Sequence, residues 1–293
     1  MLRNVRAIVS GGSSGLGAAA ASHIVKNGGK VVVADLKASE ENFWNMNRML
    51  EEIVTPSQSY SSNNTQPCAS SFSTSQVLAF SETDVTNADQ VSRALDMAED
   101  VFGKPVNAAI SCAGIGVAKK TISKARENTE VNRLYQAHPP ELFWEALDVN
   151  VVGTFNVARL AAERMASQEP EGGGQDTLRG CIINTASIAA YEGQIGQVAY
   201  ATSKAAIVGM TLPMARDLAS HGIRVMTIAP GLFRTPLLDG LPSTVEEELG
   251  ASVPLPSRLG DPEEFGLLVG TILTNPMLNG SVIRLDGALR MPP

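Results

Sequence analysis

The stretch Ser10-Gly11-Gly12-Ser13-Ser14-Gly15-Leu16-Gly17 joins an apolar, β-branched run at residues 5–10 to an amphipathic run at residues 15–27. Glycine adopts backbone conformations closed to other residues and lets the chain approach a ligand closely. The first N–H groups of the following helix are free to bind an anion. Gly11, Gly15 and Gly17 therefore predict a turn that holds the pyrophosphate of a dinucleotide. Taken alone, the turn is also compatible with an ordinary strand-to-helix connection.

The same alternation of strand and helix continues along the chain. Short β-branched runs predict strands at residues 5–10, 30–35, 76–80, 106–111, 180–186, 223–228 and 282–285. Longer amphipathic runs predict helices at residues 15–27, 40–54, 88–102, 141–165, 198–219 and 262–273. This order is typical of a parallel sheet with helices on both faces. We expect residues 1–293 to form a single α/β domain, a doubly wound Rossmann domain with a mostly parallel seven-stranded sheet.

Three segments do not follow this alternation. Residues 55–75 are dominated by Ser, Thr, Asn, Gln and Pro, which predicts a mobile surface insertion, because such a segment buries little apolar surface. Residues 118–140 are polar and follow a strand end, so we expect a loop that borders the ligand crevice. Residues 236–255 are apolar with Gly and Pro between them, and we expect a lid over the substrate.

Composition and charge narrow the class of protein. The formal net charge of -7 argues against the basic face that non-specific nucleic-acid binding requires. Cys68, Cys112 and Cys181 contain no C-x-x-C pair, so neither a disulfide framework nor a metal site is expected. No apolar run reaches the roughly 18 residues of a membrane span. The sequence therefore favours a protein without a membrane span and without nucleic-acid partners.

The amino-terminal residues carry a charge bias. The first 34 residues contain four Lys or Arg side chains and no Asp or Glu, a bias that mitochondrial targeting segments share. The first expected strand already begins at residue 5, so little chain is available for cleavage. Mitochondrial and cytosolic residence both remain open.

Acidic and small residues follow the next strands. Asp35 ends the second strand, about 20 residues after the glycine turn, where a carboxylate accepts the hydroxyls of the adenosine ribose. It would repel a 2'-phosphate, so NAD is favoured over NADP. A helix N-cap or a solvated strand end is the alternative. Asp84-Val85 and Cys112-Ala113-Gly114 follow the third and fourth strands, and only this placement makes them candidates for the adenine and ribose walls.

Tyr200 and Lys204 lie four residues apart in the helix expected at 198–219, so their side chains share one helical face. A phenol with its ordinary pKa near about 10 is a poor base at neutral pH. A neighbouring ammonium, with the positive nicotinamide of bound NAD, lowers that pKa. The spacing predicts a tyrosine base assisted by lysine. It also arises by chance in proteins of this size.

Ser187 and Asn150 complete the predicted catalytic group. Ser187 ends the strand expected at 180–186, thirteen residues before Tyr200, and its hydroxyl can stabilise a developing carbonyl oxygen. Asn150 lies in an apolar helical stretch, where its amide could interrupt the helix and hold a water that links Lys204 to solvent. A helix-packing amide is the alternative for Asn150. The four residues together predict oxidation of a secondary alcohol.

These residues resemble the short-chain dehydrogenase/reductase family, and the resemblance covers the whole chain. Five longer runs resemble one branch of that family, the type II 3-hydroxyacyl-CoA dehydrogenases. The runs are Ile182 to Ser187, Tyr191 to Gln197, Arg224 to Phe233, Pro256 to Pro262, and Ile283 to Ala288. The resemblance implies an NAD-linked homotetramer, usually mitochondrial, that oxidises 3-hydroxyacyl-CoA thioesters and accepts some steroids.

The resemblance also implies roles for individual residues. Ser187, Gln194 and Tyr200 are expected near the substrate. The residues expected at the cofactor include the glycine turn and the turn after the fourth strand. They are Gly11, Ser14, Gly15, Leu16, Gly17, Asp35, Asp84, Val85, Cys112, Ala113, Gly114, Tyr200, Lys204, Pro230, Phe233 and Thr235.

We therefore expect hydride transfer that interconverts a 3-hydroxyacyl-CoA and a 3-ketoacyl-CoA. Tyr200 takes the hydroxyl proton, Ser187 stabilises the carbonyl, Lys204 orients the ribose and lowers the pKa of the phenol, and Asn150 supports the proton relay. A dehydrogenase of hydroxysteroids or other bulky secondary alcohols is one alternative. A non-catalytic dinucleotide-binding subunit of a larger assembly is another.

Two residues depart from the family pattern. Ser111 stands where the family usually has Asn, so the backing of the central strand is expected to differ. Arg234 separates Phe233 from Thr235 where close relatives have a small residue. It adds either a phosphate or CoA contact or a surface charge.

Overall fold

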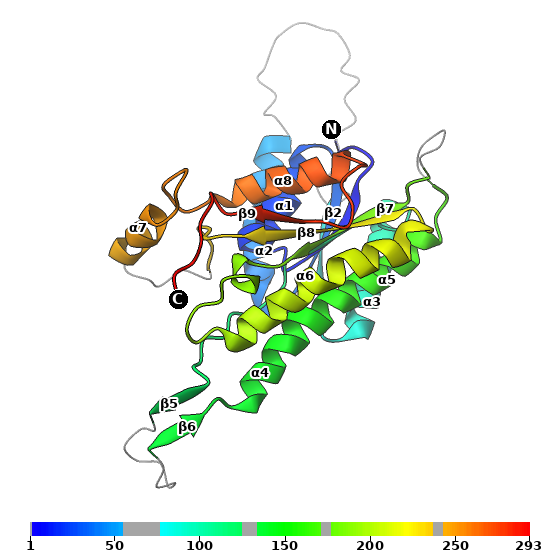
Figure 1. Cartoon of the computed structure of the whole chain (residues 1–293). Coiled ribbons are helices and arrows are strands. Elements are labelled where there is room, and N and C mark those ends of the chain that lie inside the picture. Colours follow the sequence, from blue (N-terminus) through cyan, green and yellow to red (C-terminus); the bar gives the residue numbers. More distant parts are fainter. Residues whose placement is uncertain (1, 55–76, 125–133, 171–176, 237–242) are drawn as a thin grey trace, which may run out of the picture.

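The computed structural model of the chain describes residues 2–54, 77–124, 134–170, 177–236 and 243–293 (Figure 1). The insertion expected at residues 55–75 lies outside the described residues. Parts of the expected loop at 118–140 and of the expected lid at 236–255 also lie outside them.

The described residues contain a seven-stranded sheet with the strand order β3-β2-β1-β4-β7-β8-β9. All neighbouring strands in it run parallel. The doubly wound α/β fold expected from the sequence is thus confirmed. The strands are β1 (Arg6–Ser10), β2 (Lys30–Asp35), β3 (Leu78–Glu82), β4 (Ala108–Ser111), β7 (Gly180–Thr185), β8 (Ile223–Pro230) and β9 (Val282–Leu285).

Helices cover both faces of the sheet (Figure 1). Val9, Ile110 and Ile183 pack on one face with α1 (Gly15–Lys26), α2 (Glu40–Val54) and α8 (Pro262–Thr274). The residues that alternate with them face the other layer, formed mainly by α3 (Ala88–Phe102), α5 (Thr154–Ala166) and α6 (Val198–Ala219). The central strands are buried on both faces, which explains why their sequences read as continuous apolar runs.

The order of the strands determines where a ligand can bind. The chain crosses from β1 to β2 in one direction and reaches β4 on the opposite side of β1. The loops that follow β1 and β4 therefore diverge and leave a crevice at the carboxyl edge of the sheet. The glycine turn follows β1 and Cys112 follows β4, so both lie at this switch point.

Three segments differ from the sequence-based expectation. The helix expected at 141–165 is divided into α4 (Pro140–Leu147), a π-helical turn (Asp148–Gly153) and α5. The segment expected to be a polar loop contains an antiparallel hairpin of β5 (Ile122–Lys124) and β6 (Tyr135–Ala137). The expected lid contains α7 (Ser243–Ala251). These elements are short or polar, so hydrophobic periodicity gives little signal for them.

Arg224 of β8 connects the sheet to α8. It is a charged side chain, yet it is buried, with 5% of its surface exposed. Its Nη1 donates to the carbonyl of Leu278 at 2.6 Å, and its Nη2 donates to the carbonyls of Ile272 and Leu273 at 2.9 and 3.2 Å. The last carbonyls of a helix have no partners within the helix. One buried guanidinium thus completes the carboxyl end of α8.

We expect Arg224→Met to lower the free energy of unfolding by about 3 kcal/mol, because it leaves several carbonyls without their charged donor. The melting temperature should fall by roughly 5–10 °C. Thermal and urea unfolding measure the effect. The control is Arg93→Met, on the exposed face of α3. An equal loss in both variants would contradict a specific role for Arg224.

Candidate active site

The glycine turn packs tightly against the end of β4. Gly11 has a φ of 65°, and a Cβ on it would lie 2.7 Å from the backbone nitrogen of Ala113. A Cβ on Gly17 would overlap the carbonyl of Gly11. The N-cap of helix α1, Ser14, makes no side-chain hydrogen bond to the helix. The first N–H groups of α1 therefore have no side-chain acceptor at the cap. The turn therefore fits an anionic diphosphate.

Asp35 lies beside this turn, at the carboxyl end of β2. Its Oδ2 accepts from the N–H of Ser13 at 3.0 Å, and its Oδ1 accepts from the N–H of Leu36 at 2.8 Å. The following short 3-10 helix has Leu36 at its N-cap, so Asp35 is not a helix cap there. A carboxylate retains further lone pairs, which suit it to accept two ribose hydroxyls.

Tyr200 and Ser187 meet at the same edge, as the sequence predicts. Ser187 Oγ accepts from the N–H of Ala189 at 3.1 Å, which leaves its hydrogen free to be donated. Burial raises the pKa of Tyr200, and hydrogen bonding from Ser187 opposes that rise. The arrangement therefore needs a nearby cation if the phenol is to act as a base.

Lys204 supplies that cation one helical turn further along α6. Its Nζ lies 5.7 Å from the centroid of the Tyr200 ring and donates to the carbonyl of Thr185 at 3.0 Å. Burial lowers the pKa of Lys204 to about 8, while the neighbouring Cys112 acts in the opposite direction. A lysine with this pKa exchanges a proton readily near neutral pH, which suits it to a relay.

Asn150 interrupts the helix, as expected, but its amide binds protein groups. Its Oδ1 accepts from the N–H of Ile115 at 2.8 Å. Its Nδ2 donates to the carbonyl of Ile115 at 3.0 Å and to Ser203 Oγ at 2.9 Å. Both amide hydrogens are thus engaged. The water relay expected at Asn150 stays a prediction.

Sequence reasoning missed three residues of this network. Ser203 Oγ donates to the carbonyl of Tyr200 at 2.7 Å and connects Asn150 to α6. Ile115 and Thr185 contribute backbone groups, and a backbone contact carries no residue-type signal. Only Ser203, directly before Lys204, was open to detection, as a polar side chain on a buried helical face.

The other residues expected at the cofactor lie around the crevice. Asp84 Oδ1 accepts from the N–H and the hydroxyl of Thr86 at 2.9 and 2.8 Å, so its carboxylate also shapes a turn. Cys112 Sγ lies 3.4 Å from Thr185 Oγ1. Val85 packs against Gly153. Cofactor contacts for all of these residues stay predictions.

Several expected residues lie on the loops at the ends of β4 and β8. Pro230 ends β8, and Phe233 forms a bridge with Gly260. Thr235 packs against Gly15: a Cβ on Gly15 would lie 3.4 Å from the Thr235 side chain. The remaining small residues, Ala113 and Gly114, follow β4, and Leu16 begins the packing of α1 on the core.

The two departures from the family pattern differ in their surroundings. Arg234 forms an exposed ion pair with Asp261 at 2.6 Å, in agreement with the surface-charge alternative. Ser111 pairs in register with Asn184 of β7, and both are buried. Within the described part of the chain, Ser111 Oγ and both polar atoms of the Asn184 amide have no hydrogen-bond partner.

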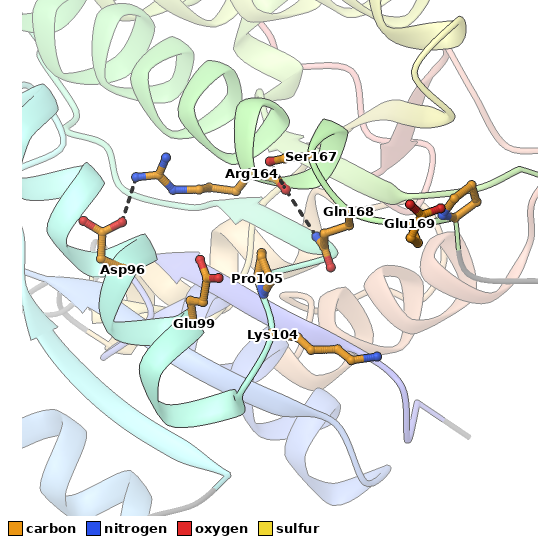
Figure 2. Close-up of a pocket in the computed structure, with 9 residues that line it drawn as sticks. Asp96, Glu99, Lys104, Pro105, Arg164, Ser167, Gln168 and Glu169 are labelled. Carbon is orange, nitrogen blue, oxygen red and sulfur yellow. Dashed lines mark hydrogen bonds and ion pairs between the residues drawn. The ribbon is translucent and has the colours of Figure 1, made fainter.

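Two surface hollows do not contain Tyr200. The larger, of about 740 Å³, lies between the carboxyl ends of α3 and α5 and is lined by Asp96, Lys104 and Arg164 among others (Figure 2). Its Pro105 precedes β4, so it opens at the amino edge of the sheet, opposite the catalytic residues. The second, of about 610 Å³, runs from the glycine turn along α1 between α2 and α8. The catalytic assignment therefore rests on contacts and not on cavity size.

In the ranges that the structure describes, no helix is both long and apolar enough to cross a bilayer. Nor do three or more His, Cys, Asp or Glu side chains in these ranges gather closely enough to bind a metal ion.

Comparison with known proteins places these contacts in a family context. The sequence profile described as short chain dehydrogenase matches residues 52–246. The chain is 47% identical to the 3-hydroxyacyl-CoA dehydrogenase type-2 of Bos taurus over 292 residues, which cover 100% of this chain and 97% of that protein. It is 45% identical to the protein of the same name from Drosophila melanogaster, with 100% of both chains covered.

A solved structure is also similar. It is 3-hydroxyacyl-CoA dehydrogenase type-2 from Mycobacterium avium, with a TM-score of 0.77 and 36% identity, covering 98% of this chain and 96% of that one. The likeness therefore extends over the whole fold, including the edge at which Ser187, Tyr200 and Lys204 meet.

The buried lysine predicts a pH dependence of stability. The pKa of Lys204 is lowered to about 8 in the folded chain from the ordinary 10.5, so between these values the unfolded chain binds more protons. Stability due to this residue is therefore least below about pH 8 and rises through the window above it. We expect the free energy of unfolding of the wild type, relative to Lys204→Met, to increase from about pH 8 to about pH 10.

Urea unfolding of both proteins across this range measures the difference. Taking the difference between the two proteins removes the contribution of groups common to both. Parallel curves would contradict a lowered pKa for Lys204.

Proposed function

The chain belongs to the short-chain dehydrogenase family, and on this premise we propose that it interconverts 3-hydroxyacyl-CoA and 3-ketoacyl-CoA with NAD as the hydride carrier. The observation that carries the proposal is that Ser187, Tyr200 and the buried Lys204 come together at one edge of the sheet, with Lys204 Nζ 5.7 Å from the centroid of the Tyr200 ring. The acyl-CoA substrate is supported by the names of relatives that match over the full length of the chain.

The chemistry follows from the roles these contacts permit. NAD, held by the glycine turn and Asp35, would supply the acceptor for the hydride of the hydroxyl-bearing carbon of the substrate. Ser187 donates its free hydrogen to the substrate oxygen as that oxygen becomes a carbonyl. Tyr200 takes the hydroxyl proton. Lys204 favours the ionised phenol and passes a proton on through its own titration.

NAD in preference to NADP is supported by Asp35. Its carboxylate is held by two backbone N–H groups at the end of β2, where the ribose hydroxyls of a dinucleotide would bind. A 2'-phosphate at this position would meet a negative charge. Lys37, two residues further along, is the side chain that could soften this preference, and it is exposed and forms an ion pair with Glu40.

A homotetramer is part of the proposal. Trp144 on α4, Phe155 on α5, and Val198 and Leu212 on α6 are large apolar residues that are exposed in the single chain. Exposed apolar groups on packed helices are typical of surfaces that associate. The acid-free amino-terminal residues support a mitochondrial location, with the cytosol as the alternative.

Turnover tests the role of Tyr200. With acetoacetyl-CoA present, the wild type should consume NADH. The loss of NADH absorbance measures this turnover. Tyr200→Phe keeps the ring and removes the proton-transferring hydroxyl, so kcat should fall about 10²- to 10⁴-fold. The dissociation constant for NADH should be nearly unchanged. Tyr135→Phe, on the exposed hairpin strand β6, is the matched control.

The same assay separates the alternatives. Turnover of a hydroxysteroid without NADH consumption on acetoacetyl-CoA would favour the bulky-alcohol dehydrogenase. NADH binding without turnover of either substrate would favour the non-catalytic subunit. Equal kcat in Tyr200→Phe and wild type would contradict the mechanism.

The choice of cofactor tests the role of Asp35. Asp35→Asn removes the charge but keeps the shape, so the ratio of kcat/KM for NADH to that for NADPH should fall by roughly 10- to 100-fold. Melting temperatures report whether the bonds from Ser13 and Leu36 survive. An unchanged ratio at an unchanged melting temperature would show that Asp35 does not select the cofactor.

A further inference from the structure

The carboxyl-terminal segment, Asp286 to Pro293, follows β9 and packs against the loop Tyr191 to Gln197, called here the substrate loop. Figure 1 shows the carboxyl terminus on the same side of the molecule as α7. Gln194 Nε2 donates to the carbonyl of Pro292 at 3.3 Å. The substrate loop joins Ser187 to Tyr200 along the chain, so whatever holds this loop lies next to the catalytic residues.

The strongest link between the two segments is a forked ion pair. Arg284 Nη1 and Nη2 donate to Glu192 Oε1 and Oε2 at 2.7 and 2.9 Å. Arg284 Nε donates to Asp286 Oδ2 at 2.7 Å. The side chains of Arg284, Glu192 and Asp286 are only 22%, 21% and 8% exposed. A planar guanidinium between two carboxylates fixes orientation as well as distance.

Further contacts reinforce this pair. Arg290 reaches Glu192 at 3.4 Å and Asp286 at 3.2 Å. The guanidinium of Arg284 also lies 5.2 Å from the centroid of the Tyr191 ring. Arg284 lowers the pKa of Glu192, so the carboxylate is ionised at neutral pH. The substrate loop is thus held from one side by a network of charges.

The carboxyl-terminal segment also contacts the chain that follows α7. The N–H of Leu255 donates to the carbonyl of Gly287 at 3.2 Å. Leu289 is buried in a small apolar cluster with Ile188 and Val253, against which Leu232 and Met291 pack. The segment therefore lies between the substrate loop and the segment that carries α7.

We propose that Glu192, Arg284 and Asp286 form a clamp that positions the substrate loop and so sets the affinity for the acyl-CoA substrate. This inference rests on the function proposed above. The clamp acts through the loop, so these are positioning residues and not catalytic ones.

The effect should fall on KM more than on kcat. Ser187 is fixed by the N–H of Ala189 next to the end of β7, and Tyr200 is fixed within α6, so neither depends on the clamp for its position. The loop between them is also held by backbone bonds: the N–H of Glu192 donates to the carbonyl of Ile188 at 3.0 Å, and the carbonyl of Gly196 accepts from the N–H of Lys119 at 2.7 Å. Without the clamp these bonds remain, and the loop loses its side-chain ion pair to the carboxyl-terminal segment.

The test compares Glu192→Gln and Glu192→Asp with the wild type, using acetoacetyl-CoA and NADH. Glu192→Gln removes the charge of the forked pair, and KM for acetoacetyl-CoA should rise about 10-fold, equivalent to about 1.4 kcal/mol. Glu192→Asp keeps the charge on a shorter side chain and should give an intermediate KM. The kcat and the dissociation constant for NADH should change far less.

The control is Asp96→Asn, which removes the 2.7 Å ion pair with Arg164 at the opposite edge of the sheet (Figure 2). It should leave KM and kcat at wild-type values. A wild-type KM in Glu192→Gln would overturn the clamp. So would a matching fall in kcat and NADH affinity, because that pattern indicates general structural loss. A wild type inactive on acetoacetyl-CoA would instead contradict the proposed function.

Discussion

The catalytic edge depends on burying the ammonium group of Lys204. A charge removed from water must be surrounded by polar groups, or its neutral form becomes favoured. The carbonyl of Thr185 supplies one acceptor at 3.0 Å. Gly114 leaves room for both Asn150 and Lys204, because a Cβ there would lie 3.0 Å from Asn150 Oδ1 and 3.5 Å from Lys204 Nζ.

The other features of the edge follow from this constraint. Asn150 lies on the π-helical turn, and its amide is fixed by the backbone of Ile115 and by Ser203. Ser203 in turn accepts this bond while donating to the carbonyl of Tyr200. The segments after β4 and β7 and the helices α5 and α6 thus meet around one buried charge. Burial raises the pKa of Tyr200 and Ser187 opposes that rise, while Lys204 Nζ lies 5.7 Å from the centroid of the ring.

The sequence predicts the part of this structure that local spacing encodes. The glycine turn, Asp35, Ser187 and the pair Tyr200 and Lys204 follow strand ends or share a helical face, so their convergence follows from the parallel sheet. The hairpin of β5 and β6 was missed because its strands are three residues each and exposed. The clamp was missed because Arg284 and Glu192 lie 92 residues apart and are brought together only by the return of the chain from β9.

The groups proposed for hydride-transfer chemistry and those proposed for substrate specificity lie on different parts of the fold. The groups proposed to move protons are held by β7, α6 and the π-helical turn, whose packing leaves little freedom. The groups proposed to surround the substrate lie on the substrate loop, on the carboxyl-terminal segment and on the chain after α7, which are joined by side-chain charges and a small apolar cluster. Arg234 and the hairpin of β5 and β6 lie outside the Lys204 network. A chain of this kind can therefore alter its substrate while keeping the same hydride-transfer chemistry, because in the described part of the chain the two sets of contacts meet at the ends of the substrate loop.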